Sequence, residues 1–213
     1  MNSSALFHNT RHEPYPLTLP AIYAQSRRQR IGDIAINDDA MDDFNGELRA
    51  LTTQAPTVNA DQISSLVRWL QTLPTETAVA TINLRMARVE TLRRMLHDAH
   101  WEMAQDFNAR CRQLLAYINR FDDLIPDDLP LIGHLDDALL IELSWGEFAG
   151  EVQDYLDFCR FRSENKVRGN AGEQRNAWET NCLAQAHEIL LREEIRSRGY
   201  SRPAPLPSFF RVS

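Results

Sequence analysis

Apolar residues recur every three or four positions through most of this chain, which is the period of one buried face of an α-helix. The pattern predicts a first helix over about 39–54 and a second over about 59–74. Asn37 or Asp38 is positioned to cap the first helix, and Asn59 with Gln62 has the spacing of a capping box. No useful stretch alternates apolar and polar residues, so the pattern predicts an all-α fold.

The longest apolar stripe runs from about residue 76 to residue 120, with no Gly or Pro inside it. It predicts one long helix, and at 1.5 Å per residue such a helix would span roughly 65 Å. That length leaves room for a kink or a break. Its members recur at intervals of three, four or seven residues: Ile82, Met86, Val89, Leu96, Met103, Phe107, Leu114 and Ile118.

Two further helices are predicted after a turn over 121–134. One covers about 135–163 and contains Gly146 and Gly150, whose spacing permits close approach to a neighbouring helix. The other covers about 173–197, after a break at 169–172, and its apolar residues are Trp178, Cys182, Ala186, Ile189 and Leu190. The expected architecture is therefore a bundle of about five helices.

The two ends of the chain lack a sustained helical period and are rich in proline. Residues 1–36 are predicted to form an extended or disordered arm, and residues 199–213 a proline-rich tail. Some apolar residues of the arm could dock onto the body: Leu17, Leu19, Ile22 and Tyr23. The single helical domain is then expected to span 37–198.

The segment from Leu124 to Ile141 is predicted to be an acidic helix–turn–helix junction. Its structural residues are Pro126, Pro130, Gly133, Asp136 and Asp137. The two prolines forbid a continuous helix, and the glycine permits a turn with positive φ. The two aspartates fall in the first turn of the next helix, where carboxylates complement the helix dipole.

The same junction resembles a known family. Leu114-Leu115-Ala116-Tyr117 is followed by Asp123-Leu124-Ile125-Pro126-Asp127, then by Pro130, Gly133 and Leu135-Asp136-Asp137. This pattern is similar to the core motif of the YkvA-like family, a small bacterial domain of unknown function. The resemblance covers about residues 105–145, and it implies a helical fold without implying a reaction. The arginines of the preceding helix and Asp128 depart from the family's apolar pattern.

The aspartates of the junction are the candidate metal ligands. Six of them lie between residues 122 and 137, and the four that could converge around the turn are Asp123, Asp127, Asp136 and Asp137. Carboxylate oxygens suit Mg²⁺ or Ca²⁺, and His134 could contribute to a transition-metal site. The competing interpretation is that these side chains cap the helix and form the turn. A second group, His97, His100 and Glu102, lacks the H-E-x-x-H spacing of zinc hydrolases.

Charge and cysteine content narrow the function classes. The formal net charge of −7 disfavours nonspecific nucleic-acid binding and favours a basic protein partner. No apolar run is long enough to cross a membrane, and no signal peptide is recognisable, so a cytoplasmic location is expected. Cys111, Cys159 and Cys182 are widely separated, which favours buried free thiols over disulfides or a zinc site.

The leading hypothesis is a non-catalytic bacterial interaction protein without a cofactor. One version is an immunity protein or antitoxin that masks a toxin with its acidic surface. The candidate partner-binding residues are Asp122, Asp128, Phe209 and Phe210. The first alternative is a metal-dependent enzyme that uses the aspartate-rich junction, with Mg²⁺ or Ca²⁺ as its ion. The second alternative is a peripheral membrane adaptor.

Overall fold

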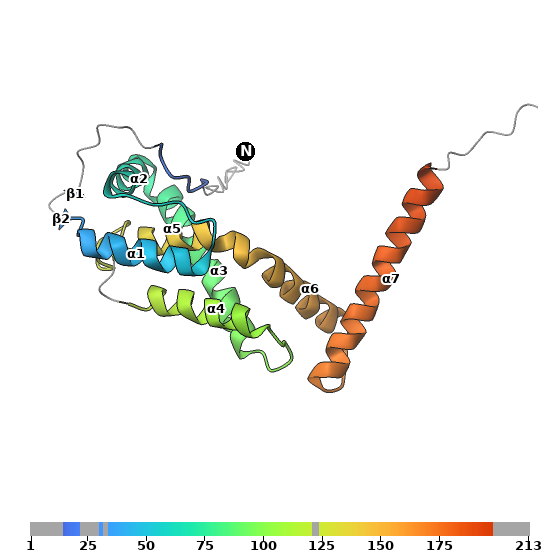
Figure 1. The fold of residues 1–213 in the computed structure, drawn as a ribbon. Helices are drawn as coiled ribbons and strands as arrows, with labels where there is room; N and C mark the ends of the chain where they lie inside the picture. The colour runs from blue at the N-terminus through green and yellow to red at the C-terminus, as the bar shows by residue number, and fades with distance from the viewer. Residues whose placement is uncertain (1–14, 22–29, 32–33, 121–123, 198–213) are drawn as a thin grey trace, which may run out of the picture. The chain divides into compact units, whose positions relative to one another are not determined.

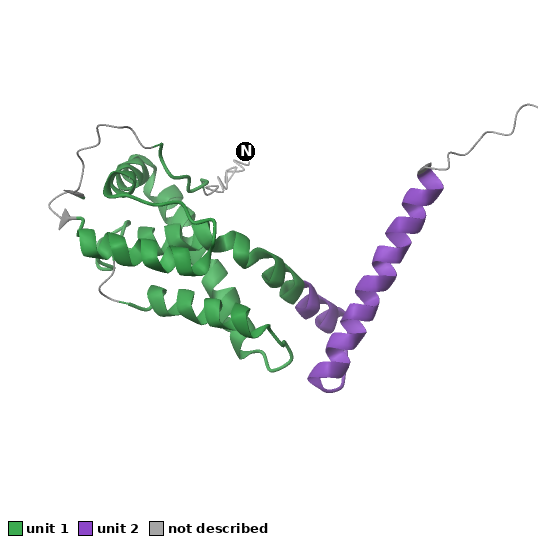
Figure 2. Ribbon diagram, in the orientation of Figure 1, with its two compact units in different colours: residues 1–156 green, residues 157–213 purple. Residues whose placement is uncertain are grey.

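The computed structural model describes residues 15–21, 30–31, 34–120 and 124–197, and these are predominantly α-helical. The chain divides into two compact units, residues 1–156 and residues 157–213 (Figure 2). No helix among the described residues is both long enough and apolar enough to span a membrane.

The first two helices begin where the sequence places their caps. Helix α1, Asp38–Leu51, is capped by Asn37, whose side chain accepts a hydrogen bond from the Asp39 amide. Helix α2, Ala60–Thr72, has the complete capping box between Asn59 and Gln62. Two two-residue strands, β1 (Arg30–Ile31) and β2 (Ile34–Ala35), pair antiparallel just before α1.

The prediction of one long helix over 76–120 is wrong in one respect, because the chain forms two helices there. Helix α3 covers Thr75–His97 and α4 covers Gln105–Ile118. The connection turns at Asp98, whose carboxylate accepts from the His100 amide, and it buries Trp101. That indole lies edge-on to Tyr155 and donates to Glu151 at 3.1 Å. Burial of a large aromatic side chain therefore offsets the backbone hydrogen bonds lost at the break.

The helix predicted over 135–163 is also interrupted. Helix α5, Leu135–Ser144, leads through a single 3-10 turn, η1 (Trp145–Glu147), into α6, Ala149–Asn165. A methyl group added at Gly146 or Gly150 would have no atom of the described residues within 4 Å. The close helix approach that the spacing of this pair permits is therefore not made by any part of the chain that the structure describes.

Helix α5 occupies the centre of the first unit. All of its residues from Leu135 to Ile141 are buried, as expected for a helix that is apolar on every side. It contacts α1, α3 and α4, and α1 and α4 run side by side (Figure 1). The largest fully buried side chains of this core are Phe44, Leu48, Ile63, Leu92, Met95, Leu114, Tyr117 and Phe148.

Part of the N-terminal arm is ordered against this core. Leu17 is buried, the Tyr15 amide donates to Thr81 at 3.1 Å, and Gln62 donates to the Pro20 carbonyl. The expectation that apolar residues of the arm dock onto the body holds for Leu17. Ile22 and Tyr23, which the same expectation named, lie outside the described residues.

The second unit contains the end of α6 and helix α7, Ala171–Ser197. Asn170 and Glu173 exchange side-chain to backbone hydrogen bonds at the start of α7. Trp178 is buried against Phe158, edge to face at 5.9 Å between ring centroids, and its indole donates to Asp157 at 2.9 Å. These contacts attach the first turns of α7 to α6.

Candidate functional site

The turn between α4 and α5 is held by local backbone hydrogen bonds. The Leu129 amide donates to the Pro126 carbonyl at 3.1 Å, and the Gly133 amide donates to the Leu129 carbonyl at 2.9 Å. Leu131 has a φ of 74°, the left-handed conformation that costs an L-residue free energy. The positive φ predicted at Gly133 is thus found two residues earlier.

Gly133 has a different role, which is to allow close packing. A β-carbon at this position would lie 2.4 Å from the carbonyl oxygen of Asp127, closer than two such atoms can approach. The missing side chain therefore lets the backbone at 133 lie directly on the backbone at 127. Because His134 follows Gly133 directly, this backbone contact also brings the side chains of Asp127 and His134 close together.

Asp136 serves the backbone of the junction. Its side chain is fully buried, and Oδ2 accepts a hydrogen bond from the Ile125 amide at 3.2 Å. The two residues are eleven positions apart, so the bond closes the turn onto the first turn of α5. Asp136 thus joins two segments of the junction by a side-chain to backbone hydrogen bond.

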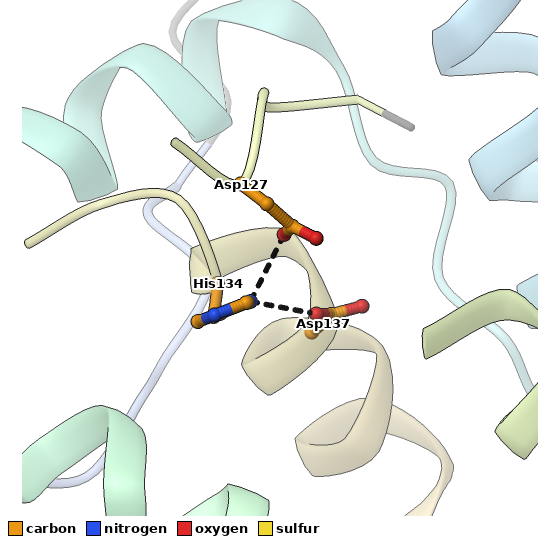
Figure 3. Close-up of side chains that lie close together, drawn as sticks. All are labelled: Asp127, His134 and Asp137. Carbon is orange, nitrogen blue, oxygen red and sulfur yellow. Dashed lines mark hydrogen bonds and ion pairs between the residues drawn. The ribbon is translucent and has the colours of Figure 1, made fainter. Parts of the chain in front are cut away.

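Asp127, His134 and Asp137 converge at the start of α5 (Figure 3). The ring nitrogen Nδ1 of His134 lies 2.9 Å from Oδ1 of Asp127 and 3.3 Å from Oδ2 of Asp137. One ligand-type atom from each residue lies within 4.8 Å of the other two. We call these three residues the corner triad.

The three side chains differ in their exposure to solvent. Asp137 is completely buried in the first turn of α5, whereas the side chains of Asp127 and His134 are 26% and 49% exposed. The triad therefore has a buried floor and an open side that faces water. The amino-terminal end of α5, which carries the positive end of the helix dipole, lies at the same place.

The structure separates the four aspartates that were predicted to converge on a metal ion. Asp127 and Asp137 come together, Asp136 is turned to the Ile125 amide, and Asp123 lies outside the described residues. His134 joins the first two. In the second histidine group, His100 pairs with Asp98 at 3.5 Å and His97 contacts the Arg93 carbonyl, so the two rings have different partners.

Of the four candidate partner-binding residues, only Asp128 lies among the described residues. Asp128 is exposed on the turn, and Asp122, Phe209 and Phe210 lie outside the described residues. A surface that the sequence did not predict lies on α7 instead. Five large aliphatic side chains of this helix are between 44% and 72% exposed: Leu183, Ile189, Leu190, Leu191 and Ile195. We call them the α7 aliphatic surface.

The sequence places Ile189 and Leu190 in the apolar pattern of the last helix together with Trp178, but the structure leaves both of them exposed. A signal of this exposure was present in the sequence. At about 3.6 residues per turn, Leu183 and Leu190 share one side of the helix, Ile189 lies on one flank of them, and Leu191 and Ile195 lie on the other. A helix that buries one face in a globular domain has its apolar residues on that face. Leucine and isoleucine on several sides indicate a segment without one fixed inner face.

The acidic side chains are concentrated in the first unit, residues 1–156. Residues 1–156 contain 23 acidic and 13 basic side chains, whereas residues 157–213 contain 7 acidic and 10 basic ones. Asp38, Asp39, Asp42 and Asp43 are all exposed on α1. A hollow of about 380 Å³ beside them is lined by Asp42, Asp43, Gly46, Glu47, Gln113 and Arg120.

An apolar hollow lies between the N-terminal segment and α2. Its volume is about 430 Å³, and it is lined by Tyr15, Pro16, Thr18, Pro20, Leu66 and Trp69. Tyr15 and Trp69 stand edge to face with ring centroids 6.2 Å apart. No charged side chain lines this hollow among the described residues, so it fits apolar ligands.

All three cysteines are free thiols, as the sequence predicted. Cys111 is fully buried, whereas Cys159 and Cys182 are half-buried. Burial raises the pKa of the Cys111 thiol to about 12, against an opposing effect of the nearby Arg110. A thiol of this kind is an inert core group and a poor nucleophile.

Comparison with protein-family models, with curated proteins and with solved structures finds no match for this chain. The resemblance of the junction to the YkvA-like family therefore stays a prediction, carried by the motif alone. Three features of the described residues bear on function: the corner triad, the exposed acidic residues of α1 and the α7 aliphatic surface.

Proposed function

We propose that this protein acts by binding another protein, and that the α7 aliphatic surface is the main contact. The observation that carries the proposal is the exposure of Leu183 and Leu190, at 72% and 64%, one above the other on the helix. Burying one leucine side chain gains about 1.5–3 kcal/mol relative to leaving it in water. A partner with an apolar groove would recover that free energy.

The length of α7 supports the same proposal. Its first turns pack through Trp178, whereas every residue from 183 to 196 is exposed. Isolated helical segments of fewer than about 12–15 residues are marginal in water, because tertiary packing supplies most of a helix's stability. A groove that closes around this segment would stabilise it.

The charge distribution specifies the partner further. The first unit is strongly acidic, and the exposed aspartates of α1 would attract a basic protein and speed its association. We therefore propose a partner that has an apolar groove and an excess of basic residues elsewhere on its surface. An immunity protein or antitoxin that neutralises a basic toxin is the specific version we favour.

The test is recovery of a stoichiometric partner from the native host with the full chain and two variants. One variant carries Leu183→Ser and Leu190→Ser. The matched control carries Gln185→Ser, an exposed position on the same helix. We expect the parent and the control to recover the same partner in equal amounts and the double variant to lose at least nine-tenths of it.

Three results would overturn the proposal: no stoichiometric partner at any of several salt concentrations, a partner that the double variant retains in full, or a dimer of this chain in sedimentation that the double variant dissociates. The toxin version has its own test. The recovered partner, expressed alone, should stop growth, and co-expression of this protein should restore it. A partner with no effect on growth would exclude the toxin version and leave the binding function intact.

A further inference from the structure

We propose that the corner triad, Asp127, His134 and Asp137, is a binding site for a divalent transition-metal ion such as Co²⁺ or Zn²⁺. The inference is independent of the proposed protein partner, because the triad lies in the first unit and the α7 aliphatic surface lies in the second. It rests on the distances within the triad, on one buried carboxylate oxygen and on the chemistry of the donor atoms.

The distances agree with those between ligands on one metal ion. Ligand atoms about 2.1 Å from a metal are about 3.0 Å apart along an octahedral edge and about 3.4 Å apart along a tetrahedral edge. Nδ1 of His134 lies 2.9 Å from the Asp127 oxygen and 3.3 Å from the Asp137 oxygen. The third pair of donor atoms, one oxygen each from Asp127 and Asp137, lies within 4.8 Å. All three residues can therefore present a donor atom to the same small region.

One oxygen of the triad is left without a proton donor by this geometry. Oδ1 of Asp127 is buried and accepts no hydrogen bond from the described residues, although it lies 2.9 Å from Nδ1. A hydrogen on Nδ1 lies in the ring plane and can point at only one acceptor, and the contact that qualifies as a hydrogen bond is the one to Asp137. A metal ion between the three atoms would satisfy the Asp127 oxygen as well, because it attracts every donor at once.

The donor set selects the class of ion. One imidazole nitrogen with two carboxylate oxygens suits zinc, cobalt, manganese or ferrous iron, whereas Mg²⁺ and Ca²⁺ prefer oxygen donors alone. The aspartates alone would favour Mg²⁺ or Ca²⁺, and the added histidine nitrogen favours a transition-metal ion instead. Two protein oxygens and one nitrogen leave coordination positions for water, which can reach the site past the exposed ring of His134.

The fold supports the triad from both sides. Asp137 is fixed in the first turn of the buried helix α5, and the second carboxylate of that turn, Asp136, holds the Ile125 backbone. The backbone of Asp127 can lie close to the site because Gly133 has no β-carbon, which would otherwise clash with the Asp127 carbonyl oxygen. Metal sites depend on such surrounding contacts to hold their ligands in place.

The experiment is a titration of the chelator-treated full chain with Co²⁺ alone, followed by calorimetry and by the visible absorption of the ion. Two variants alter one ligand each on a partly exposed side chain: His134→Ala removes the nitrogen donor, and Asp127→Asn replaces a charged carboxylate donor with a weaker, neutral amide oxygen. Asp128→Asn is the matched control, because it removes the same charge from the exposed neighbouring position. Asp137 is not substituted, since a change in a fully buried carboxylate would confound binding with folding.

We expect one equivalent of Co²⁺ to bind with a Kd in the micromolar range, displaced by Zn²⁺ and not by equal Mg²⁺. Each donor variant should weaken binding at least about tenfold, and the control should stay within about twofold. Circular dichroism of every variant should match the parent.

Four results would overturn the proposal. They are no saturable binding up to millimolar Co²⁺, unchanged affinity in the His134 variant, equal losses in Asp127→Asn and Asp128→Asn, and an absorption band of cobalt–thiolate ligation, which would place the ion on cysteines.

Discussion

Arg85 on α3 and Glu142 on α5 form a hydrogen-bonded ion pair, in which the arginine Nε donates to Oε2 at 3.0 Å. The arginine side chain is only 3% exposed, and its Nη1 donates to the carbonyls of both Tyr15 and Thr81. One guanidinium group thus joins the ordered N-terminal segment, α3 and the central helix. Glu142 also accepts from Arg88 at 2.8 Å.

Replacing Glu142 with Gln should destabilise the first unit because it leaves the buried Arg85 charge without its counter-ion. Removal of one partner from a buried ion pair costs about 3–5 kcal/mol, and the 25% exposure of Glu142 reduces the expected loss to about 2–3 kcal/mol. Urea unfolding followed by circular dichroism measures the loss. Arg94→Ala, at an exposed position on α3, is the control and should change stability by less than about 0.5 kcal/mol.

Replacing Asp136 with Ala should loosen the junction. The Ile125 amide is buried and donates to this carboxylate, and a buried donor left without an acceptor costs about 1–3 kcal/mol. Asp136→Asn retains an acceptor oxygen, so it should cost less than Asp136→Ala. Hydrogen exchange at the Ile125 amide reports the bond directly. Equal protection of that amide in the parent and the alanine variant would show that the bond does not form.

Replacing Gly133 with Ala should destabilise the protein, because the new methyl group would lie 2.4 Å from the Asp127 carbonyl oxygen. Overpacking of this kind costs about 1–3 kcal/mol, since the backbone must move. Gly150→Ala makes the same chemical change in α6, where nothing lies within 4 Å, and should be stabilising by up to about 1 kcal/mol. Thermal unfolding of the two variants should therefore shift the melting temperature in opposite directions.

Cys111 should resist thiol reagents in the native protein at pH 8. Burial raises its pKa from the ordinary 9.0 to about 12, so the reactive thiolate is scarce, and the fully buried sulfur is also inaccessible. A colorimetric thiol assay should detect no more than two fast thiols in native protein and three in denaturant. Three fast thiols in the native protein would contradict the burial of this residue.

The raised pKa of Cys111 also determines how the free energy of unfolding changes with pH. The unfolded state releases the Cys111 proton near pH 9, whereas the native state retains it until about pH 12. Stability from this group is therefore complete below pH 9 and falls as the pH rises between the two values. Cys111→Ala should remove that part of the alkaline loss, measured as the slope of unfolding free energy against pH.

Local chemistry was readable from the sequence where a few neighbouring residues decide the structure. Asn59 and Gln62 cap α2 as their spacing predicted, and Asp136 and Asp137 fall in the first turn of α5. The break after His97 was not predictable in the same way. The helical period continues through it, and the stabilising event is burial of Trp101 against Tyr155, more than fifty positions away.

The helical class, the caps and the position of the acidic junction could be predicted from residue order, because they depend on periods and spacings within one or two turns. Long-range packing decided that Asp127 and Asp137 meet at His134 while Asp136 turns to the backbone. It also decided that Trp178 is buried and Leu190 is exposed on the same helix. Burial depends on which parts of the chain pack together, and helical periodicity cannot supply that information.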